Sequence, residues 1–164
     1  MPLQIVQGDI TRVPCDAIVN ASNGIGFMGG KAGMKRRLAG VAESIHYATQ
    51  GQVEAAAKAV CRAHHPFGFG PGQVFVTPAF HLNCHYILHA VTMRFPGTRS
   101  SLKTVKKLLP KILDQARSLG ITGIALPLLG AGTGHVSEKR LLALYHQVFD
   151  SVEDLDICVY IYRK

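Results

Sequence analysis

The sequence predicts an α/β fold in which strands and helices alternate around a mostly parallel sheet. Short apolar runs have the length and composition of buried strands, longer amphipathic segments separate most of them, and glycine-rich loops directly follow two of them. The expected strands cover residues 3–6, 17–21, 74–78, 86–91, 124–128 and 157–162. Strands that alternate with helices in this way build a sheet that is covered on both faces.

The first expected helix begins near residue 34. Three further helical segments are expected over residues 41–63, 101–120 and 137–149. Gly51 interrupts the segment 41–63. The segment 101–120 has the clearest apolar stripe, with Ser100 or Ser101 to cap its start and Gly120 to end it. Pro110 lies inside this stripe, so a kink or an earlier helix start is expected there.

Length and composition predict a single domain over residues 1–164. The chain is 48% hydrophobic and 17% charged, which excludes intrinsic disorder. No apolar run has the length of a membrane span, and the first 20 residues lack the pattern of a secretion signal. We therefore expect a cytoplasmic protein without a membrane partner.

The chain carries a formal net charge of +8, and much of its basic character lies in residues 31–37 and 103–111. A positive field attracts phosphate groups of nucleotides or nucleic acids, although the second cluster is equally typical of a solvated helix face. Aromatic residues are not interleaved with either cluster, which argues against a base-stacking surface.

Four scattered cysteines are expected to be thiols rather than disulfides. Cys61 and His64, together with His81 and Cys84, have the ligand types of a zinc site. The interpretation that we favour is unrelated core and loop residues, with no metal and no cofactor.

Two glycine-rich loops, at residues 24–33 and 130–134, are suited to bind phosphate. Backbone N–H groups approach a diphosphate closely where no side chain intervenes, and both loops are expected at the carboxyl edge of the sheet. Each loop is alternatively a simple tight turn. Gly24, Gly26 and Gly29 satisfy G-x-G-x-x-G, but the following window predicts helix where a Rossmann fold needs a strand.

Two polar residues accompany the first loop. Asp9 follows the first strand, and its carboxylate is able to accept a hydrogen bond from an exocyclic amine such as that of adenine. Asn23 ends the second strand and has an amide that suits ribose hydroxyls. The alternative is that Asp9 and the nearby Asn20 cap or close turns.

These motifs together resemble the macro domain family. Six segments occur in the order found in that family: GDIT at residues 8–11, DAIVNASN at 16–23, GFMGGKAG at 26–33, VTPA at 76–79, ILHAV at 87–91 and ALPLLGAGTG at 125–134. The resemblance covers residues 3–162. It implies a three-layer α/β/α sandwich with a mixed, mostly parallel central sheet, and an ADP-ribose site.

The resemblance also implies a role for each site residue. Asp9 would recognise adenine with the Ile10 backbone beside it, Tyr162 would pack on the adenine, and Asn23 would orient the distal ribose. Asn20 would be a structural amide beneath it. The first phosphate loop would comprise Gly29, Gly30, Lys31, Ala32 and Gly33, and the second Gly130, Ala131, Gly132, Thr133 and Gly134.

Catalysis is less clearly implied, because the family's acid and lysine positions are not matched. Gly33 stands where many family hydrolases have an acid, and Met93 and Gly134 stand where another branch has a lysine and an aspartate. We expect binding of ADP-ribose or of ADP-ribosylated targets, with at most weak hydrolysis of ester adducts such as O-acetyl-ADP-ribose, in which Asn23 would position the water. The alternative is a basic protein that binds nucleic acid or poly(ADP-ribose) without catalysis.

Overall fold

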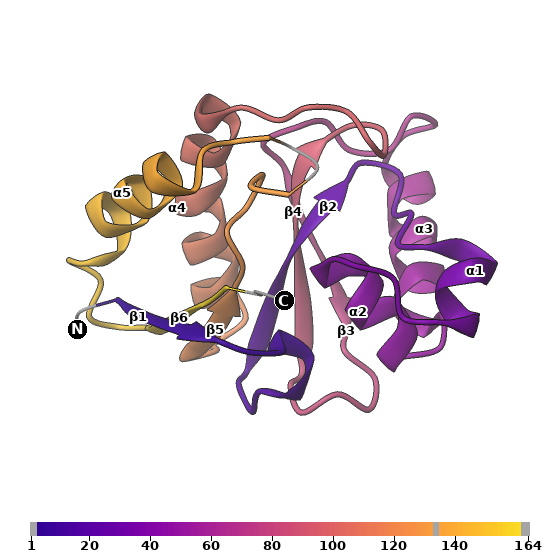
Figure 1. Cartoon of the computed structure of the whole chain (residues 1–164), viewed down its shortest axis with the longest axis horizontal. Coiled ribbons are helices and arrows are strands. Elements are labelled where there is room, and N and C mark those ends of the chain that lie inside the picture. The colour runs from indigo at the N-terminus through magenta and orange to yellow at the C-terminus, as the bar shows by residue number, and fades with distance from the viewer. Residues whose placement is uncertain (1–2, 133–134, 162–164) are drawn as a thin grey trace.

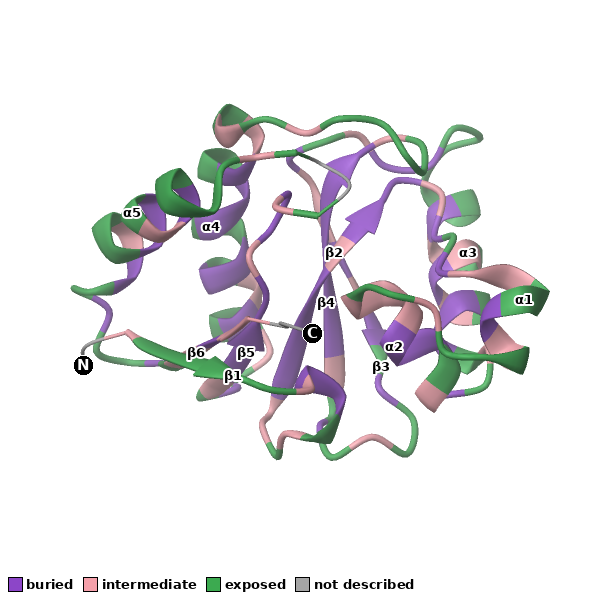
Figure 2. Ribbon diagram, viewed as in Figure 1, coloured by how far each residue is buried: buried purple, intermediate pink, exposed green. Residues whose placement is uncertain are grey.

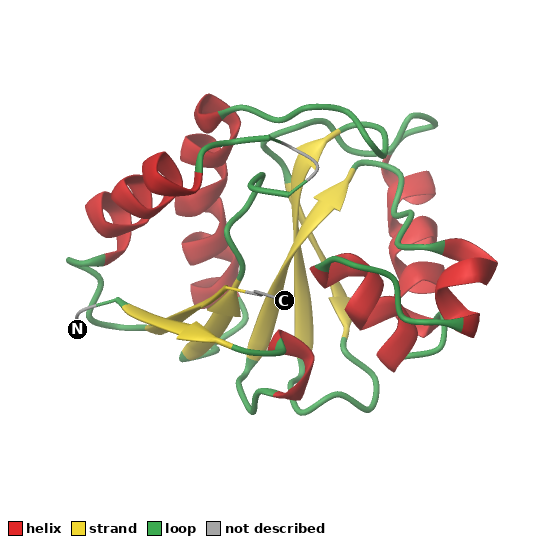
Figure 3. Cartoon of the chain, in the orientation of Figure 1, coloured by secondary structure: helices red, strands yellow, loops and turns green. Residues whose placement is uncertain are grey.

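The computed structural model describes residues 3–132 and 135–161 of the 164-residue chain. A central sheet lies between two groups of helices, with α4 and α5 on one face and α1, α2 and α3 on the other (Figures 1 and 3). Its strand order is β1-β6-β5-β2-β4-β3, and every neighbouring pair is parallel except β3 with β4. The predicted mixed, mostly parallel α/β sandwich is confirmed.

The elements follow the predicted order closely. In chain order they are β1 (Gln4–Gln7), a 3-10 turn η1 (Ile10–Arg12), β2 (Ala17–Asn23), α1 (Gly30–Lys35), α2 (Val41–Ala48), α3 (Gln52–His64), β3 (Val74–Pro78), β4 (Tyr86–Met93), α4 (Leu102–Ser118), β5 (Gly123–Leu126), α5 (Glu138–Phe149) and β6 (Asp156–Ile161). The predicted break at Gly51 is confirmed, because this residue adopts a left-handed φ of 85° between α2 and α3.

The helix α4 begins as its sequence predicts. The Ser101 hydroxyl accepts a hydrogen bond from the Thr104 N–H at 3.2 Å, which caps the helix N-terminus. The helix then continues through Pro110, whose ring is exposed to solvent. The expected earlier helix start is therefore wrong, and the alternative of a kink at Pro110 stays a prediction.

Alternate residues of the central strands face two separate cores. Ala17 and Val19 of β2 belong to the core beneath α4 and α5, whereas Ile18 between them belongs to the core beneath α2. The same alternation holds along β4 and β5, so both faces of these strands are buried, while β1 at the edge is exposed (Figure 2). This packing fixes the strands, so the carboxyl ends of the parallel strands lie together at one edge of the sheet.

No helix in residues 3–132 and 135–161 combines the length and apolar character that a membrane crossing requires.

Candidate functional site

A cavity of about 880 Å³ opens at the carboxyl ends of the parallel strands. Its wall is built from residues that follow or end β1, β2, β4, β5 and β6, together with the segment that leads into α2. The lining residues are Gly8–Ile10, 21–23, Phe27, 37–44, 92–93, 96–97, 127–128, 130–132, Glu138 and 160–161. The volume lies within the range of small-molecule sites, and the position is where α/β sheets bind ligands.

Asp9 lies at one end of this cavity and caps the turn η1. Its carboxylate accepts hydrogen bonds from the Thr11 N–H at 3.0 Å and the Thr11 hydroxyl at 2.7 Å, and the Arg37 guanidinium lies 2.9 Å away. Burial alone would raise the pKa of Asp9, but the bonds from Thr11 and Arg37 together outweigh it and hold the pKa below its ordinary value. Asp9 is therefore an ionised acceptor in the cavity wall.

Arg37 joins Asp9 to the start of α2. Besides the ion pair with Asp9, its guanidinium donates hydrogen bonds to the Ser44 hydroxyl at 3.2 and 3.0 Å, and that hydroxyl donates to the Gly40 carbonyl at 2.7 Å. The sequence placed Arg37 only within a basic cluster. Its partners come from η1 and α2, so no local pattern could have singled it out.

Glu43 is a second carboxyl group in the cavity wall. Its side chain turns back over the first residues of its own helix α2, where a Cβ added at Gly40 would collide with the carboxylate. Burial raises the pKa of Glu43 above its ordinary value. Sequence reasoning missed this residue because its segment showed only the composition of an ordinary helix.

Asn23 lines the cavity, and its amide also braces the loop that follows β2. The side-chain oxygen accepts from the Ile25 N–H at 3.2 Å and the Phe27 N–H at 3.1 Å, while the side-chain N–H₂ donates to the Phe27 carbonyl at 2.8 Å. This arrangement leaves at most one N–H of the amide for a ligand.

Asn20 is fully buried beneath this site and acts as a structural amide. Its side-chain nitrogen lies 3.2 Å from His89 Nδ1, and His89 Nε2 lies 2.9 Å from the Thr77 hydroxyl. Burial lowers the pKa of His89 to about 3, so the ring is neutral. The three side chains link β2, β4 and β3 through the middle of the sheet.

The first glycine loop packs against α2 and α3 in this structure. The Glu54 carboxylate accepts hydrogen bonds from the Met28 N–H at 2.6 Å and the Gly30 N–H at 3.1 Å. His46 Nε2 lies 2.7 Å from the Gly30 carbonyl, and a Cβ at Gly29 would approach the His46 ring to 3.0 Å. Close packing against α2 therefore gives a reason for glycine in this loop that is independent of phosphate binding.

Phe27 of this loop lines the cavity, whereas the five residues predicted to hold phosphate lie outside its wall. Gly29, Gly30, Lys31, Ala32 and Gly33 are absent from the lining, and residues 37–44 at the start of α2 take that place beside Asn23. Lys31 and Ala32 are exposed on α1.

The second glycine loop does line the cavity. Gly130 has a left-handed φ of 83°, and its carbonyl accepts from the Val136 N–H at 2.8 Å. The buried Tyr145 hydroxyl holds the start of this loop, because it accepts from the Leu129 N–H and donates to the Pro127 carbonyl. Ala131 and Gly132 follow in the cavity wall, whereas Thr133 and Gly134 lie outside the described residues.

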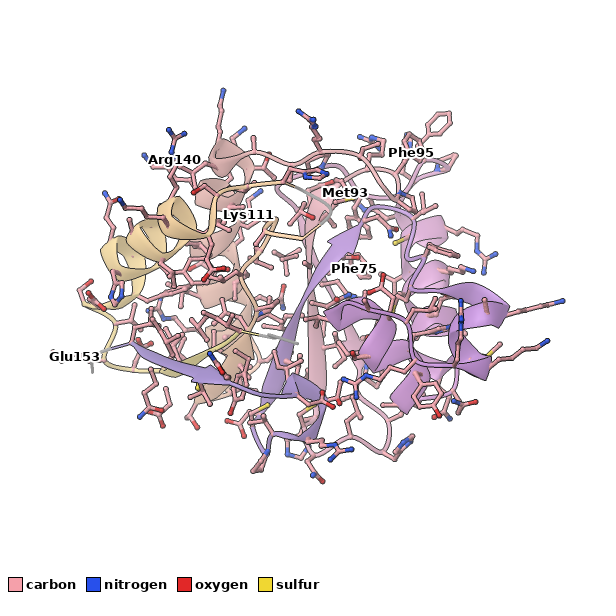
Figure 4. The ribbon with its side chains drawn as sticks, viewed as in Figure 1. Phe75, Met93, Phe95, Lys111, Arg140 and Glu153 are labelled. Carbon is pink, nitrogen blue, oxygen red and sulfur yellow. The ribbon has the colours of Figure 1, made fainter. Side chains whose placement is uncertain are left out.

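The last strand contributes Tyr160 and Ile161 to the cavity. The Tyr160 ring packs near Gly8, 3.9 Å from the position of an added Cβ, and thus borders the end where Asp9 lies. The predicted Tyr162 lies outside the described residues. At the end of β4, Met93 lines the cavity at the position where a branch of the family has a lysine (Figure 4).

The four residues considered for zinc are not brought together. Cys61 packs in the core beneath α3, whereas Cys84 packs in the core beneath α2. In the described part of the chain, no group of three or more His, Cys, Asp or Glu side chains is arranged to hold a metal ion.

Comparison with solved structures shows that the fold is that of macrodomains. The macrodomain of Mycobacterium tuberculosis DarG superposes with a TM-score of 0.80 at 22% identity, covering 96% of each chain. The Thermus aquaticus DarG macrodomain gives 0.77 at 24% identity, covering 99% of this chain and 98% of that one. The Oceanobacillus iheyensis macrodomain with ADP gives 0.80 at 21% identity, covering 99% and 83%.

Sequence relatives extend this similarity. An uncharacterized protein of Thermoplasma acidophilum is 33% identical over 154 residues, which cover 93% of this chain and 74% of that protein. A macro domain-containing protein of Ralstonia nicotianae is 33% identical over 131 residues, covering 79% and 68%. An uncharacterized protein of Thermoplasma volcanium is 31% identical over 130 residues, which span 79% of this chain and 65% of the relative.

The family model of the macro domain matches residues 19–144, which include β2, the first glycine loop, β5 and the second glycine loop. This match covers more than half of the chain, and the fold agrees with it along its whole length. The chain therefore belongs to the macro domain family.

Proposed function

We propose that this chain binds ADP-ribose, free or attached to a target, in the 880 Å³ cavity. The observation that supports this most directly is that Asp9 and the loop 130–132 lie in the wall of one cavity, although Gly130 comes 121 positions after Asp9 in the sequence. The solved Oceanobacillus iheyensis macrodomain contains ADP, the nucleotide portion of that ligand.

In this proposal Asp9 accepts a hydrogen bond from the adenine amine, with the Ile10 backbone beside it. The side chain of Tyr160, which borders the same end, packs near the base, and Tyr162 is proposed to add to that contact. Arg37 contributes positive charge close to the adenosine end. The Asp9 carboxylate would then accept hydrogen bonds from both the adenine amine and Arg37, because its two oxygens have enough lone pairs for both donors.

The diphosphate would lie between the second glycine loop and the start of α2. Gly130, Ala131 and Gly132 supply one wall, and Thr133 and Gly134 are proposed to continue it. The other wall is formed by residues 37–44. Gly29, Gly30, Lys31, Ala32 and Gly33, which are not in the cavity lining, stay predicted phosphate-binding residues.

Hydrolysis of an ester adduct is a finer part of the proposal. Water would attack the ester carbonyl and release the acid and ADP-ribose, while Asn23 helps to orient the ribose. Glu43 is the side chain in the wall that we propose to transfer a proton, because burial raises its pKa above the ordinary value of a glutamate. Gly33, Met93 and Gly134 offer no proton-transfer group, so we expect slow turnover.

Free thiols support a reducing compartment such as the cytoplasm. All four cysteines are unpaired in the structure, and thiols persist where disulfides are reduced.

Calorimetry with ADP-ribose tests the binding proposal, with AMP and ribose 5-phosphate as partial ligands. We expect ADP-ribose to bind at micromolar concentration and each fragment to bind more weakly. Failure of ADP-ribose to bind would refute the proposal. Incubation with O-acetyl-ADP-ribose and with an ADP-ribosylated protein then tests turnover, with Glu43→Gln as the comparison. Equal rates for both forms would exclude Glu43 from proton transfer.

A further inference from the structure

The positive charge of this protein is concentrated in one continuous part of the chain. Residues 55–113 contain eight of the 18 basic residues and none of the 10 acidic ones. The remaining ten basic residues are matched by ten acidic residues elsewhere. The whole formal excess of +8 therefore comes from α3, the loop that follows β4 and the first part of α4.

The fold gathers many of these cations at the carboxyl edge of the sheet. The Lys111 ammonium donates to the Gly72 carbonyl at 2.7 Å, and the Lys107 stem lies 3.7 Å from an added Cβ at Gly72. Gly72 precedes β3, which is antiparallel to β4, so its loop lies at the same edge as the end of β4. We call the set of cations at this edge the basic rim: Arg62, Arg94, Arg99, Lys103, Lys107 and Lys111.

Aromatic side chains are exposed within the basic rim. Phe67 is 62% exposed and Phe95 is 48% exposed, and Phe95 projects at the periphery of the molecule (Figure 4). The Arg94 guanidinium donates to the Phe67 carbonyl at 3.2 Å and directly precedes Phe95 in the sequence. Arg94 thus contacts the backbone of one exposed aromatic residue and adjoins the other in the chain, although the two aromatic residues are 28 positions apart.

The basic rim continues into the candidate ADP-ribose cavity. Pro96 and Gly97, which follow Phe95, line the cavity, and so does Phe27. The Gly24 N–H bonds to the Arg94 carbonyl at 2.9 Å, which holds the loop after β2 against the loop after β4. A polymer attached to a ligand in the cavity therefore meets the basic rim directly.

We propose that the basic rim binds a single-stranded nucleic acid, and that the target bearing the ADP-ribose is such a strand. This inference rests on the proposed function of the cavity for the ADP-ribose itself. Phosphates would pair with the cations of the rim, and bases would stack on Phe67 and Phe95, as single-strand binding surfaces do.

Fluorescence anisotropy with a labelled 20-nucleotide poly(dT) strand over a series of salt concentrations tests this surface. The Arg99→Gln/Lys103→Gln variant removes two exposed cations of the rim. The matched control Lys139→Gln/Arg140→Gln removes two exposed charges from the start of α5, outside the set of residues that defines the rim (Figure 4). Phe67→Ala and Phe95→Ala test stacking separately.

We expect the rim variant to lower the slope of log K against log salt by about 1.4, which weakens binding roughly 25-fold at 0.1 M salt, because each lost phosphate contact changes the slope by about 0.7. Each phenylalanine variant should weaken binding at least about fivefold. Equal affinity of the rim variant and its control would overturn the proposal. So would tighter binding of a poly(ADP-ribose) chain or an acidic peptide than of the oligonucleotide.

ADP-ribose affinity, measured by calorimetry on the same variants, separates this proposal from the proposed function. We expect the rim variants to bind ADP-ribose as the parent protein does, and Asp9→Ala to retain oligonucleotide binding. A parent protein that binds the strand but not ADP-ribose would refute the proposed function and leave the nucleic-acid surface intact. One that binds ADP-ribose but not the strand would refute the surface alone.

Discussion

Substitution of Gly132 by valine gives a direct test of the second glycine loop. An ideal Cβ at Gly132 meets no described atom within 4 Å, and the residue lines the cavity. Since its φ is outside the left-handed region, valine should fit the backbone and change the free energy of unfolding by less than about 0.5 kcal/mol. Its branched side chain would instead occupy space that we assign to the diphosphate.

The expected loss of affinity follows from the bonds that the valine would displace. A charge-assisted hydrogen bond contributes about 1.5–3 kcal/mol, so separation of the diphosphate from two loop N–H groups costs about 3–6 kcal/mol. This corresponds to a Kd at least about 100-fold higher. Calorimetry with ADP-ribose measures it, with urea unfolding as the check on stability.

Two variants make this result interpretable. Ala143→Val adds the same branched side chain at an exposed position of α5 and should leave the Kd unchanged. Gly130→Val is expected to unfold at lower urea, because Gly130 has a φ of 83° and an added Cβ would lie 3.0 Å from the Val136 side chain. A folded Gly132→Val protein with the parent Kd would refute the assignment of this loop.

Three further outcomes are expected. Asp9→Ala should weaken ADP-ribose binding by about 1.5–3 kcal/mol in calorimetry, the value of a hydrogen bond to a charged acceptor, and an unchanged Kd would remove Asp9 from the site. Glu54→Gln should lower the free energy of unfolding by about 1–3 kcal/mol in urea, because the Met28 and Gly30 N–H groups lose a charged acceptor. His89→Gln should flatten the pH dependence of stability. Because burial lowers the pKa of His89 from 6.5 to about 3, the unfolded chain binds the proton first, and stability falls as the pH drops from about 6.5 toward 3. Thermal unfolding of both forms at several pH values measures this, and parallel curves would contradict it.

The fold could be predicted from the sequence because the strands are buried on both faces. In β2, consecutive residues face opposite cores, so Ile18 and Val19 are both apolar. The strand is therefore recognised as a continuous apolar run and not as an alternation of apolar and polar residues. The turn η1 was not predicted. It depends on Asp9 capping a turn only three residues long, and three residues carry no periodic signal.

The site was predictable where one short segment carries the chemistry. Asp9 and Asn23 lie in motifs whose neighbours are fixed by the strands before them, and both line the cavity. Arg37 and Glu43 also line it, but their positions depend on how α2 packs against η1. That packing is a tertiary contact, so a local pattern does not reveal it.

Glycine-rich segments show why sequence alone does not distinguish a ligand loop from a packing loop. A side chain at Gly26 would clash with the backbone of α3, with the Lys58 nitrogen 2.7 Å from the added Cβ, and one at Gly33 would come within 2.8 Å of the His46 ring. Both glycines are needed for the chain to pack, whether or not a phosphate binds. At Gly132 the added Cβ meets no described atom, so packing gives no reason for the missing side chain. Because Gly132 also lines the cavity, a substitution there tests the proposed diphosphate site with little effect on the packing of the described residues.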